Sequence, residues 1–280
     1  QSPAWWLIAA LLAGCGGRSR PSLMVYCAAV ARQPMEAIAE RYEAERGVRV
    51  ELQVGGSNTL LSQAIVSRAG DLLLVADGHY VSAARERGLI ARSAVVGVTR
   101  PVLVVADRLK GRVQALDDLS EGGVRLALAD PEAAAIGRCV KRLMQRAGRW
   151  EEIKTAVEQR GVFTPTVTGV ANAIEVGGAD AGFVWQAIAH SRGGLHVVDT
   201  RELSASPAPS AARSTAQSTA QSTIELAVLR GSANAGEASD FLEFVTLRGR
   251  EAFAASGFEP PANTGPRANT GPPANNEARR

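Results

Sequence analysis

Short apolar runs alternate with helix-like stretches near the start of the chain, and this order restricts the possible folds more than any other feature. The runs are LMVYCAA (23–29), VRVELQV (48–54) and LLLVAD (72–77). The stretch between the first two has apolar residues at helical spacing and ends at Gly47, a residue type typical just after a helix. Strands joined through helices lie parallel in a sheet that those helices cover. The sequence therefore predicts an α/β protein.

The pattern continues along the chain. Further strands are expected at 100–107, 125–130, 181–185 and 224–230, with helices near 136–147, 151–159, 170–176 and 237–257. A chain of 280 residues, at about 150 per domain, is long enough for two domains. Its 46% hydrophobic and 21% charged residues exclude a disordered chain or a small disulfide scaffold.

The charge pattern argues against a nucleic-acid partner. Lys and Arg total 31 against 28 Asp and Glu, a net charge of +3, and no basic cluster is interleaved with aromatic residues.

The N-terminus is predicted to be a lipoprotein signal peptide. The apolar run at 4–14 is too short to cross a bilayer as a permanent helix, and Leu12-Ala13-Gly14-Cys15 resembles a bacterial lipobox. We expect residues 1–15 to be the signal and lipobox, with Cys15 as the lipid anchor after cleavage. The protein would be exported, to the periplasm or the outer face of the cytoplasmic membrane. A short buried helix is the alternative.

Two segments have compositions that do not support a core. Residues 204–223 form a Ser/Thr/Ala/Gln/Pro-rich run, predicted to be a low-complexity insertion, and residues 259–280 repeat ANTGP, predicted to be a disordered tail. In an exported protein Cys27 and Cys139 could form a disulfide, although two unpaired buried thiols are the expected state.

The segment GGSNT (55–59) is the best candidate for a ligand site. Its two glycines permit close backbone approach, while Ser57, Asn58 and Thr59 offer side-chain donors at the start of a helix. Helix N-termini attract anions because their first N–H groups have no partner within the helix. A capped turn between a strand and a helix explains the same residues without a ligand.

Enzyme chemistry is not expected. Asp71 and Asp77 flank one strand, about 20 Å apart at ~3.3 Å per residue, which is too far for a working carboxylate pair. The three histidines lack metal-ligand spacing, so no metal site is expected, and Ser57 lacks the G-x-S-x-G elbow of a hydrolase. We interpret both aspartates as turn and cap residues.

The order of the segments resembles the molybdate-binding proteins of ABC importers, within the type II periplasmic substrate-binding family. The matching pieces include VYCAAV, GGSNTLLSQ, LLLVAD, LALADPEAAAIG, GGADAGFVW and IELAVLRGS. The resemblance implies two α/β lobes with mixed sheets covered by helices and a ligand cleft between them. Lobe 1 would comprise residues 22–100 plus 224–258, and lobe 2 residues 101–200.

The resemblance also implies which residues contact the ligand. Ser57 would contact it through its side chain, and Ile136 and Val167 through backbone N–H groups. Asn58, a side-chain donor at the same helix start, is a further candidate that could contact a larger anion together with Trp185. Val30 takes the place of a hydroxyl residue, and Trp185 that of a tyrosine. Each missing donor to a buried anion costs about 1.5–3 kcal/mol.

The expected function is therefore that of a solute receptor, not an enzyme. It would bind molybdate or tungstate by hinge closure, use no cofactor, deliver the anion to a membrane permease and act as a monomer. Val30 and Trp185 keep two alternatives open, namely a receptor for a different small anion and a degenerate two-lobe lipoprotein with a sensing or interaction role.

Overall fold

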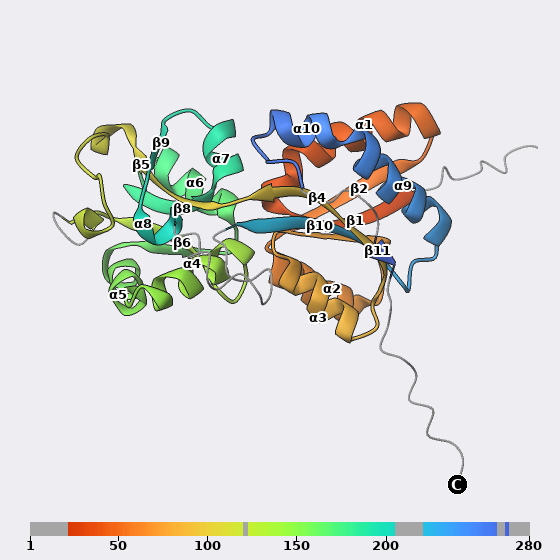
Figure 1. Cartoon of the computed structure of the whole chain (residues 1–280), viewed down its shortest axis with the longest axis horizontal. Coiled ribbons are helices and arrows are strands. Elements are labelled where there is room, and N and C mark those ends of the chain that lie inside the picture. Colours follow the sequence, from red (N-terminus) through yellow and green to blue (C-terminus); the bar gives the residue numbers. More distant parts are fainter. Residues whose placement is uncertain (1–21, 120–122, 205–220, 262–266, 269–280) are drawn as a thin grey trace, which may run out of the picture.

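The computed structural model describes residues 22–119, 123–204, 221–261 and 267–268. These residues form two lobes side by side, each built around one sheet with helices on its faces (Figure 1). The first lobe contains both the earliest and the latest of the described segments, whereas the second is built from the middle of the sequence.

The first lobe has a six-stranded mixed sheet in the order β11-β4-β10-β3-β1-β2. Its strands are β1 (Ser22–Ala28), β2 (Arg49–Gly55), β3 (Leu72–Val75), β4 (Ile90–Thr99), β10 (Ser222–Leu229) and β11 (Arg267–Ala268). Its helices are the short 3-10 turn η1 (Ala29–Ala31), α1 (Arg32–Arg46), α2 (Ser57–Ser67), α3 (Gly78–Glu86), α9 (Ala235–Arg248) and α10 (Arg250–Ala255). β1 pairs parallel with β2 and β3, whereas β10 pairs antiparallel with β3 and β4.

The second lobe has a five-stranded mixed sheet in the order β7-β6-β8-β5-β9. Its strands are β5 (Pro101–Ala106), β6 (Leu126–Ala129), β7 (Val162–Thr164), β8 (Ala181–Trp185) and β9 (Leu195–Val198). Its helices are α4 (Ala135–Arg146), α5 (Trp150–Arg160), α6 (Val167–Glu175), α7 (Gln186–Ser191) and α8 (Arg201–Ser204), with 3-10 turns η2 (Asp107–Leu109) and η3 (Asp117–Leu119).

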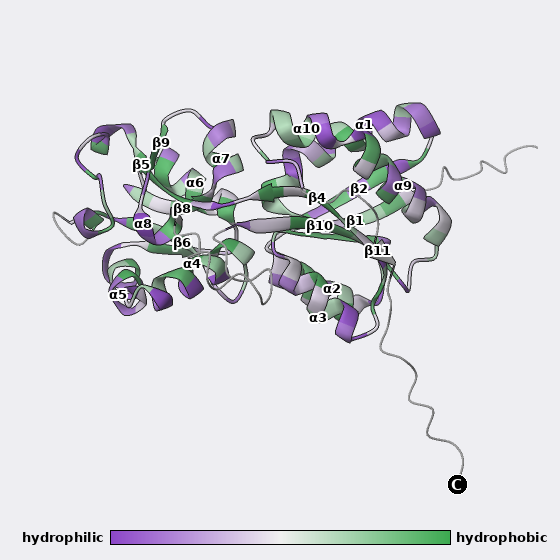
Figure 2. Cartoon of the chain, viewed as in Figure 1, coloured by the Kyte–Doolittle hydropathy of each residue, from purple (hydrophilic) through white to green (hydrophobic). Residues whose placement is uncertain are grey.

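The hydrophobic pattern explains this layering. Every residue of β3, β5, β6 and β8 is buried, as expected for strands covered on both faces. The edge strand β2 is largely exposed. Figure 2 shows hydrophobic residues along the central strands and hydrophilic residues on the outward sides of the helices. None of the described helices is long and apolar enough to cross a membrane.

The chain passes between the lobes beside Arg100. β4 ends at Thr99 in the first sheet and β5 begins at Pro101 in the second, so a single residue joins them. The backbone carbonyl of Arg100 accepts a hydrogen bond from the Gln186 N–H at 2.8 Å, and its Nε donates to Gln186 Oε1 at 2.7 Å. These bonds anchor the crossing to the second lobe, while β10 extends alongside β4 (Figure 1).

The structure departs from the sequence-based expectations at several elements. Strands β4, β7 and β9 were not expected, and the single helix expected at 237–257 is two helices that meet at Gly249. A Cβ on Gly249 would lie 2.5 Å from the Val245 carbonyl oxygen, so this tight bend requires a glycine.

The two low-complexity segments are partly ordered where the structure describes them. Ser222 and Thr223, expected in the insertion, begin β10 and pair with Thr99 and Val98 of β4. Glu259, expected in the tail, exchanges two backbone hydrogen bonds with Val98, and β11 pairs with β4. These contacts correct the prediction at those positions because β4 offers a free edge for pairing. Residues 205–220, 262–266 and 269–280 of these segments, and the signal region 1–15, lie outside the described residues.

Candidate functional site

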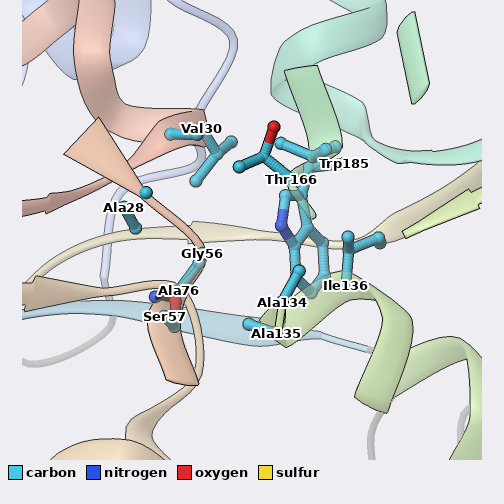
Figure 3. Close-up of a pocket in the computed structure, with 13 residues that line it drawn as sticks. Ala28, Val30, Gly56, Ser57, Ala76, Ala134, Ala135, Ile136, Thr166 and Trp185 are labelled. Atoms are coloured by element: carbon cyan, nitrogen blue, oxygen red, sulfur yellow. Dashed lines mark hydrogen bonds between the residues drawn. The ribbon is translucent and has the colours of Figure 1, made fainter. Parts of the chain in front are cut away.

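A small cavity lies between the two lobes, with a volume of about 10 Å³ open to a water-sized molecule. Figure 3 shows that its walls come from both sides of the cleft. The lining residues of the first lobe are Ala28, Ala29, Val30, Gly55, Gly56, Ser57 and Ala76. Those of the second lobe are Ala134, Ala135, Ile136, Thr166, Val167 and Trp185.

Three helices begin at this cavity. α2 starts after Gly56, α4 after Ala134 and α6 after Thr166, and all three preceding residues have extended backbones. No side chain caps α2 or α4. The first N–H groups of a helix have no carbonyl of their own helix to bind, and the helix dipole makes this end partly positive. The cavity therefore presents backbone donors from both lobes to one small volume.

Ser57 adds a hydroxyl donor from the first lobe. Its side chain is buried, and its Oγ accepts a hydrogen bond from the Ala76 N–H at 3.1 Å. Because the oxygen already accepts this bond, its rotation is restricted and its proton is left to donate to a ligand. The strand-to-helix turn at 55–57 thus places Ser57 where the sequence predicted a site residue.

Thr166 is a lining residue that the sequence analysis did not single out. It is the N-cap of α6, and its Oγ1 accepts a hydrogen bond from the Gly169 N–H at 3.2 Å. A threonine just before a predicted helix is a common N-cap signal, so its position at the helix start could have been predicted. Its place at the cavity could not, because that depends on how the lobes meet.

Val30 and Trp185 form apolar walls on opposite sides of the cavity. Val30 lies in η1 after β1, and Trp185 ends β8, where it pairs with Pro101 of β5. Trp185 is among the largest fully buried side chains. Figure 3 shows its indole nitrogen on the ring edge that faces the first lobe. Trp185 thus offers one N–H donor and fills much of the space, whereas Val30 offers no side-chain donor.

Ile136 and Val167 lie in the first turns of α4 and α6, and their side chains are buried. The structure therefore brings Val30, Ser57, Ile136, Val167 and Trp185 together around one cavity. Their role in binding a ligand stays a prediction.

Asn58 is the exception among the predicted site residues, because it does not line the cavity. Its Nδ2 donates to the Glu132 carbonyl oxygen at 2.6 Å, and its backbone N–H donates to the Ala133 carbonyl at 3.1 Å. Both carbonyls belong to the second lobe. The side chain of a residue in the first turn of α2 points across the cleft, so Asn58 joins the lobes instead of facing the cavity.

The cavity contains no charged group. None of its thirteen lining residues, all in the described part of the chain, has an ionisable side chain. A ligand would therefore be held by neutral donors and helix dipoles alone.

The two cysteines in the described segments are unpaired and buried, as expected. Burial raises the pKa of the Cys27 thiol to about 12 and that of Cys139 to about 11. Both thiols therefore stay protonated and unreactive near neutral pH.

The aspartates that flank β3 have structural roles, as interpreted from the sequence. Asp77 caps α3 by accepting the His79 N–H at 2.9 Å. Asp71 accepts hydrogen bonds from the Met24 N–H and the Ser232 hydroxyl. Among the described residues, no three His, Cys, Asp or Glu side chains cluster as metal ligands.

Comparisons with known proteins identify the same architecture. The family described as "Bacterial extracellular solute-binding protein" matches residues 23–259. The molybdate-binding protein ModA of Escherichia coli is 27% identical over 188 residues, covering 64% of this chain and 70% of the relative. ModA of Mycobacterium tuberculosis (strain H37Rv) is 24% identical over 243 residues, covering 86% of this chain and 85% of the relative.

Solved structures show the same fold at lower sequence identity. The periplasmic molybdate-binding protein of Azotobacter vinelandii has a TM-score of 0.67 at 16% identity, covering 85% of this chain and 99% of its own. A periplasmic thiamin-binding protein has a TM-score of 0.71 at 17% identity, covering 89% of this chain and 86% of its own. The two-lobe fold expected from the sequence is confirmed, and proteins that share it differ in the ligands their titles name.

Proposed function

Because this chain belongs to the family of bacterial extracellular solute-binding proteins, we propose that it captures a tetrahedral oxyanion, molybdate or tungstate, in the cavity between its lobes. It is a binding protein and not an enzyme. We further propose that it passes the anion to the permease of an ABC importer and acts as a monomer without a cofactor.

The convergence of three helix N-termini on one uncharged cavity is the observation that carries this proposal. Backbone N–H groups, the Ser57 and Thr166 hydroxyls and the Trp185 indole can all donate hydrogen bonds, which suits a ligand that only accepts them. An anion without protons is such a ligand. The dipoles of α2, α4 and α6 favour its negative charge.

The cavity also explains how binding would close the cleft. Ser57 and the start of α2 belong to the first lobe, whereas the starts of α4 and α6 and Trp185 belong to the second. Only when the lobes meet do all donors reach one anion. The ligand would therefore shift the protein from open to closed conformations.

The similarity to molybdate-binding proteins supports this choice of anion over others. Val30 and Trp185 support a second candidate, a different small anion, since neither supplies a hydroxyl. A degenerate receptor with a sensing or interaction role is the remaining alternative.

Calorimetric titration with molybdate, tungstate, sulfate and phosphate tests the proposal. We expect molybdate and tungstate to bind with low-micromolar or tighter dissociation constants while sulfate and phosphate do not. Binding of sulfate or phosphate alone would establish the second candidate. No binding of any of the four would overturn the oxyanion assignment.

Export and lipid anchoring through Cys15 are a separate proposal, supported by the Leu12-Ala13-Gly14-Cys15 lipobox. Mass spectrometry of the protein from bacterial membranes should show a chain that begins at a diacylated Cys15. Cys15→Ser should release the protein into the soluble fraction, whereas a wild-type chain with an unmodified Cys15 would contradict the anchor.

A further inference from the structure

A cluster of charged side chains joins the lobes outside the ligand cavity. Asp77 follows β3 in the first lobe, and Arg138 and Arg142 lie one turn apart on α4 in the second. Arg138 Nη1 lies 3.2 Å from Asp77 Oδ2, and Arg142 Nη1 lies 3.9 Å from the same oxygen. None of the three residues lines the cavity.

The surroundings of this cluster strengthen the interaction between its charges. The Asp77 side chain is only 13% exposed, and those of Arg138 and Arg142 are 32% and 25% exposed. Partly buried ion pairs are screened by solvent less than pairs on the open surface. The Arg138 guanidinium also stacks over the buried ring of Tyr80 in the first lobe, 5.8 Å from its centroid.

Asp77 would lose these partners if the lobes separated. Its other oxygen, Oδ1, accepts the His79 N–H within the same lobe, so this N-cap bond does not depend on closure. Within the described part of the chain, the partners of Oδ2 are the Arg138 guanidinium, which donates a hydrogen bond, and the Arg142 guanidinium, both from the second lobe. Asp77 therefore has one role in folding α3 and a separate interaction that exists only when the cleft is closed.

We infer that Asp77, Arg138 and Arg142 form an interlobe clasp, which stabilises the closed conformation before any ligand binds. The clasp acts as a set of positioning residues, since it holds the two halves of the cavity together without contacting its contents. It shares with the proposed function the assumption that the lobes move, but it does not depend on which ligand the cavity takes.

Asp77→Asn separates the two roles of this residue. Asparagine is as good an N-cap as aspartate, so α3 should fold normally, but the side chain no longer attracts the arginines. Arg138→Gln removes the main partner from the other lobe. Glu243→Gln is the matched control, because it removes one negative charge from an ion pair with Arg92 that lies within the first lobe.

Small-angle X-ray scattering of the ligand-free proteins measures the result. We expect Asp77→Asn and Arg138→Gln to increase the radius of gyration. Each should reduce the ratio of closed to open molecules about fivefold or more, a larger change than the loss of an exposed ion pair would cause. Their double variant should open by less than the sum of the two single effects, since both remove the Asp77–Arg138 pair. High salt should open the wild type and leave Asp77→Asn unchanged. Glu243→Gln should scatter like the wild type.

Three results would overturn the clasp, provided that circular dichroism shows the variants folded. One is a ligand-free wild type that is already as open as Asp77→Asn. Another is an unchanged radius of gyration in both single variants. The third is additive opening in the double variant.

Calorimetry on the same samples distinguishes this inference from the proposed function. If no oxyanion binds but Asp77→Asn opens the cleft, the clasp stands and the ligand assignment fails. If molybdate binds equally well to all variants and none opens, the ligand assignment stands and the clasp fails.

Discussion

The Ser57 hydroxyl faces the ligand cavity and also accepts a hydrogen bond from Ala76, the residue that follows β3. We expect Ser57→Ala to weaken anion binding about 10- to 100-fold, the loss of one hydrogen bond to a charged group. The Ala76 N–H would also lose its acceptor, so the thermal midpoint should fall slightly. Calorimetry with molybdate measures the first effect. Ser62→Ala, on an exposed position of the same helix, is the control, and equal binding by both variants would contradict the role of Ser57.

Gly56 permits the lobes to approach one another. A Cβ at this position would lie 2.4 Å from the Ala133 carbonyl oxygen and 2.8 Å from that of Pro165, both in the second lobe. Its φ of −74° is allowed for alanine, so Gly56→Ala should leave each lobe folded while it blocks full closure.

We therefore expect Gly56→Ala to bind the anion at least 10-fold more weakly and to scatter as a more open molecule, with little change in melting temperature. Gly236→Ala in α9 serves as the control, since a Cβ there would meet no atom within 4 Å and Gly236 does not line the cavity. Unchanged affinity in Gly56→Ala would show that the closed contacts are not needed for binding.

The sequence indicated these residues unevenly. The two glycines and Ser57 stood out because they lie where a strand turns into a helix, a local pattern. Asn58 had the same local signal, but its side chain bonds to the other lobe and not to the cavity. Thr166 lines the cavity, yet its local pattern predicts only the start of a helix. Which side chains face a cavity between lobes depends on contacts between distant segments, and no local pattern contains that information.

At the scale of elements, Asp180, just before β8, connects three segments of the second lobe through its bonds to Arg125, just before β6, and Arg108, just after β5. It accepts hydrogen bonds from the Arg125 backbone N–H and guanidinium, each at 2.8 Å, and pairs with Arg108. The hydrogen bonds from the Arg125 side chain, more than the others, hold the pKa of the Asp180 carboxyl well below its usual range.

A carboxyl whose pKa is lowered by folding stabilises the protein above its unfolded-state pKa, about 3.9, and loses that contribution as the pH falls below it. We expect Asp180→Asn to lower the free energy of unfolding at pH 7 by about 1.5–3 kcal/mol. Between pH 5 and pH 3 the wild type should lose more stability than the variant.

Urea unfolding at pH 7, 5 and 3 measures this difference. Glu36→Gln is the control, because its pair with Arg32 is exposed and should matter little. Parallel loss of stability in the wild type and Asp180→Asn on acidification would contradict the assignment.

The elements themselves show where sequence patterns suffice. Buried runs such as β3 and β8 were predicted because every residue in them is apolar. β4 was not, although it is ten residues long, since it includes Arg92, Ser93 and Gly97. Its pairing with β10, far along the chain, is what makes it a strand.

On the scale of the whole molecule, the ligand should stabilise both lobes together because each supplies part of the cavity. At a molybdate concentration 100 times the dissociation constant, the free energy of unfolding should rise by about 2.7 kcal/mol. Calorimetric scans should show this as one transition that moves to higher temperature. Two transitions of which only one moves would mean that the anion contacts a single lobe. As a control, the transition temperature of Ser57→Ala at the same molybdate concentration should rise less than that of the wild type.

The place of β10 in the first sheet also determines when the protein can become functional during its synthesis. This strand lies between β3 and β4 and is hydrogen-bonded to both, so until it emerges β4 has no connection to the rest of that sheet. Every residue that lines the cavity precedes it in the chain. A nascent chain that ends before Ser222 therefore contains all the groups that would hold the anion, yet it lacks the strand that completes half of their scaffold. All strands of the second sheet precede β10, whereas the receptor can form only after β10 is available to the first sheet.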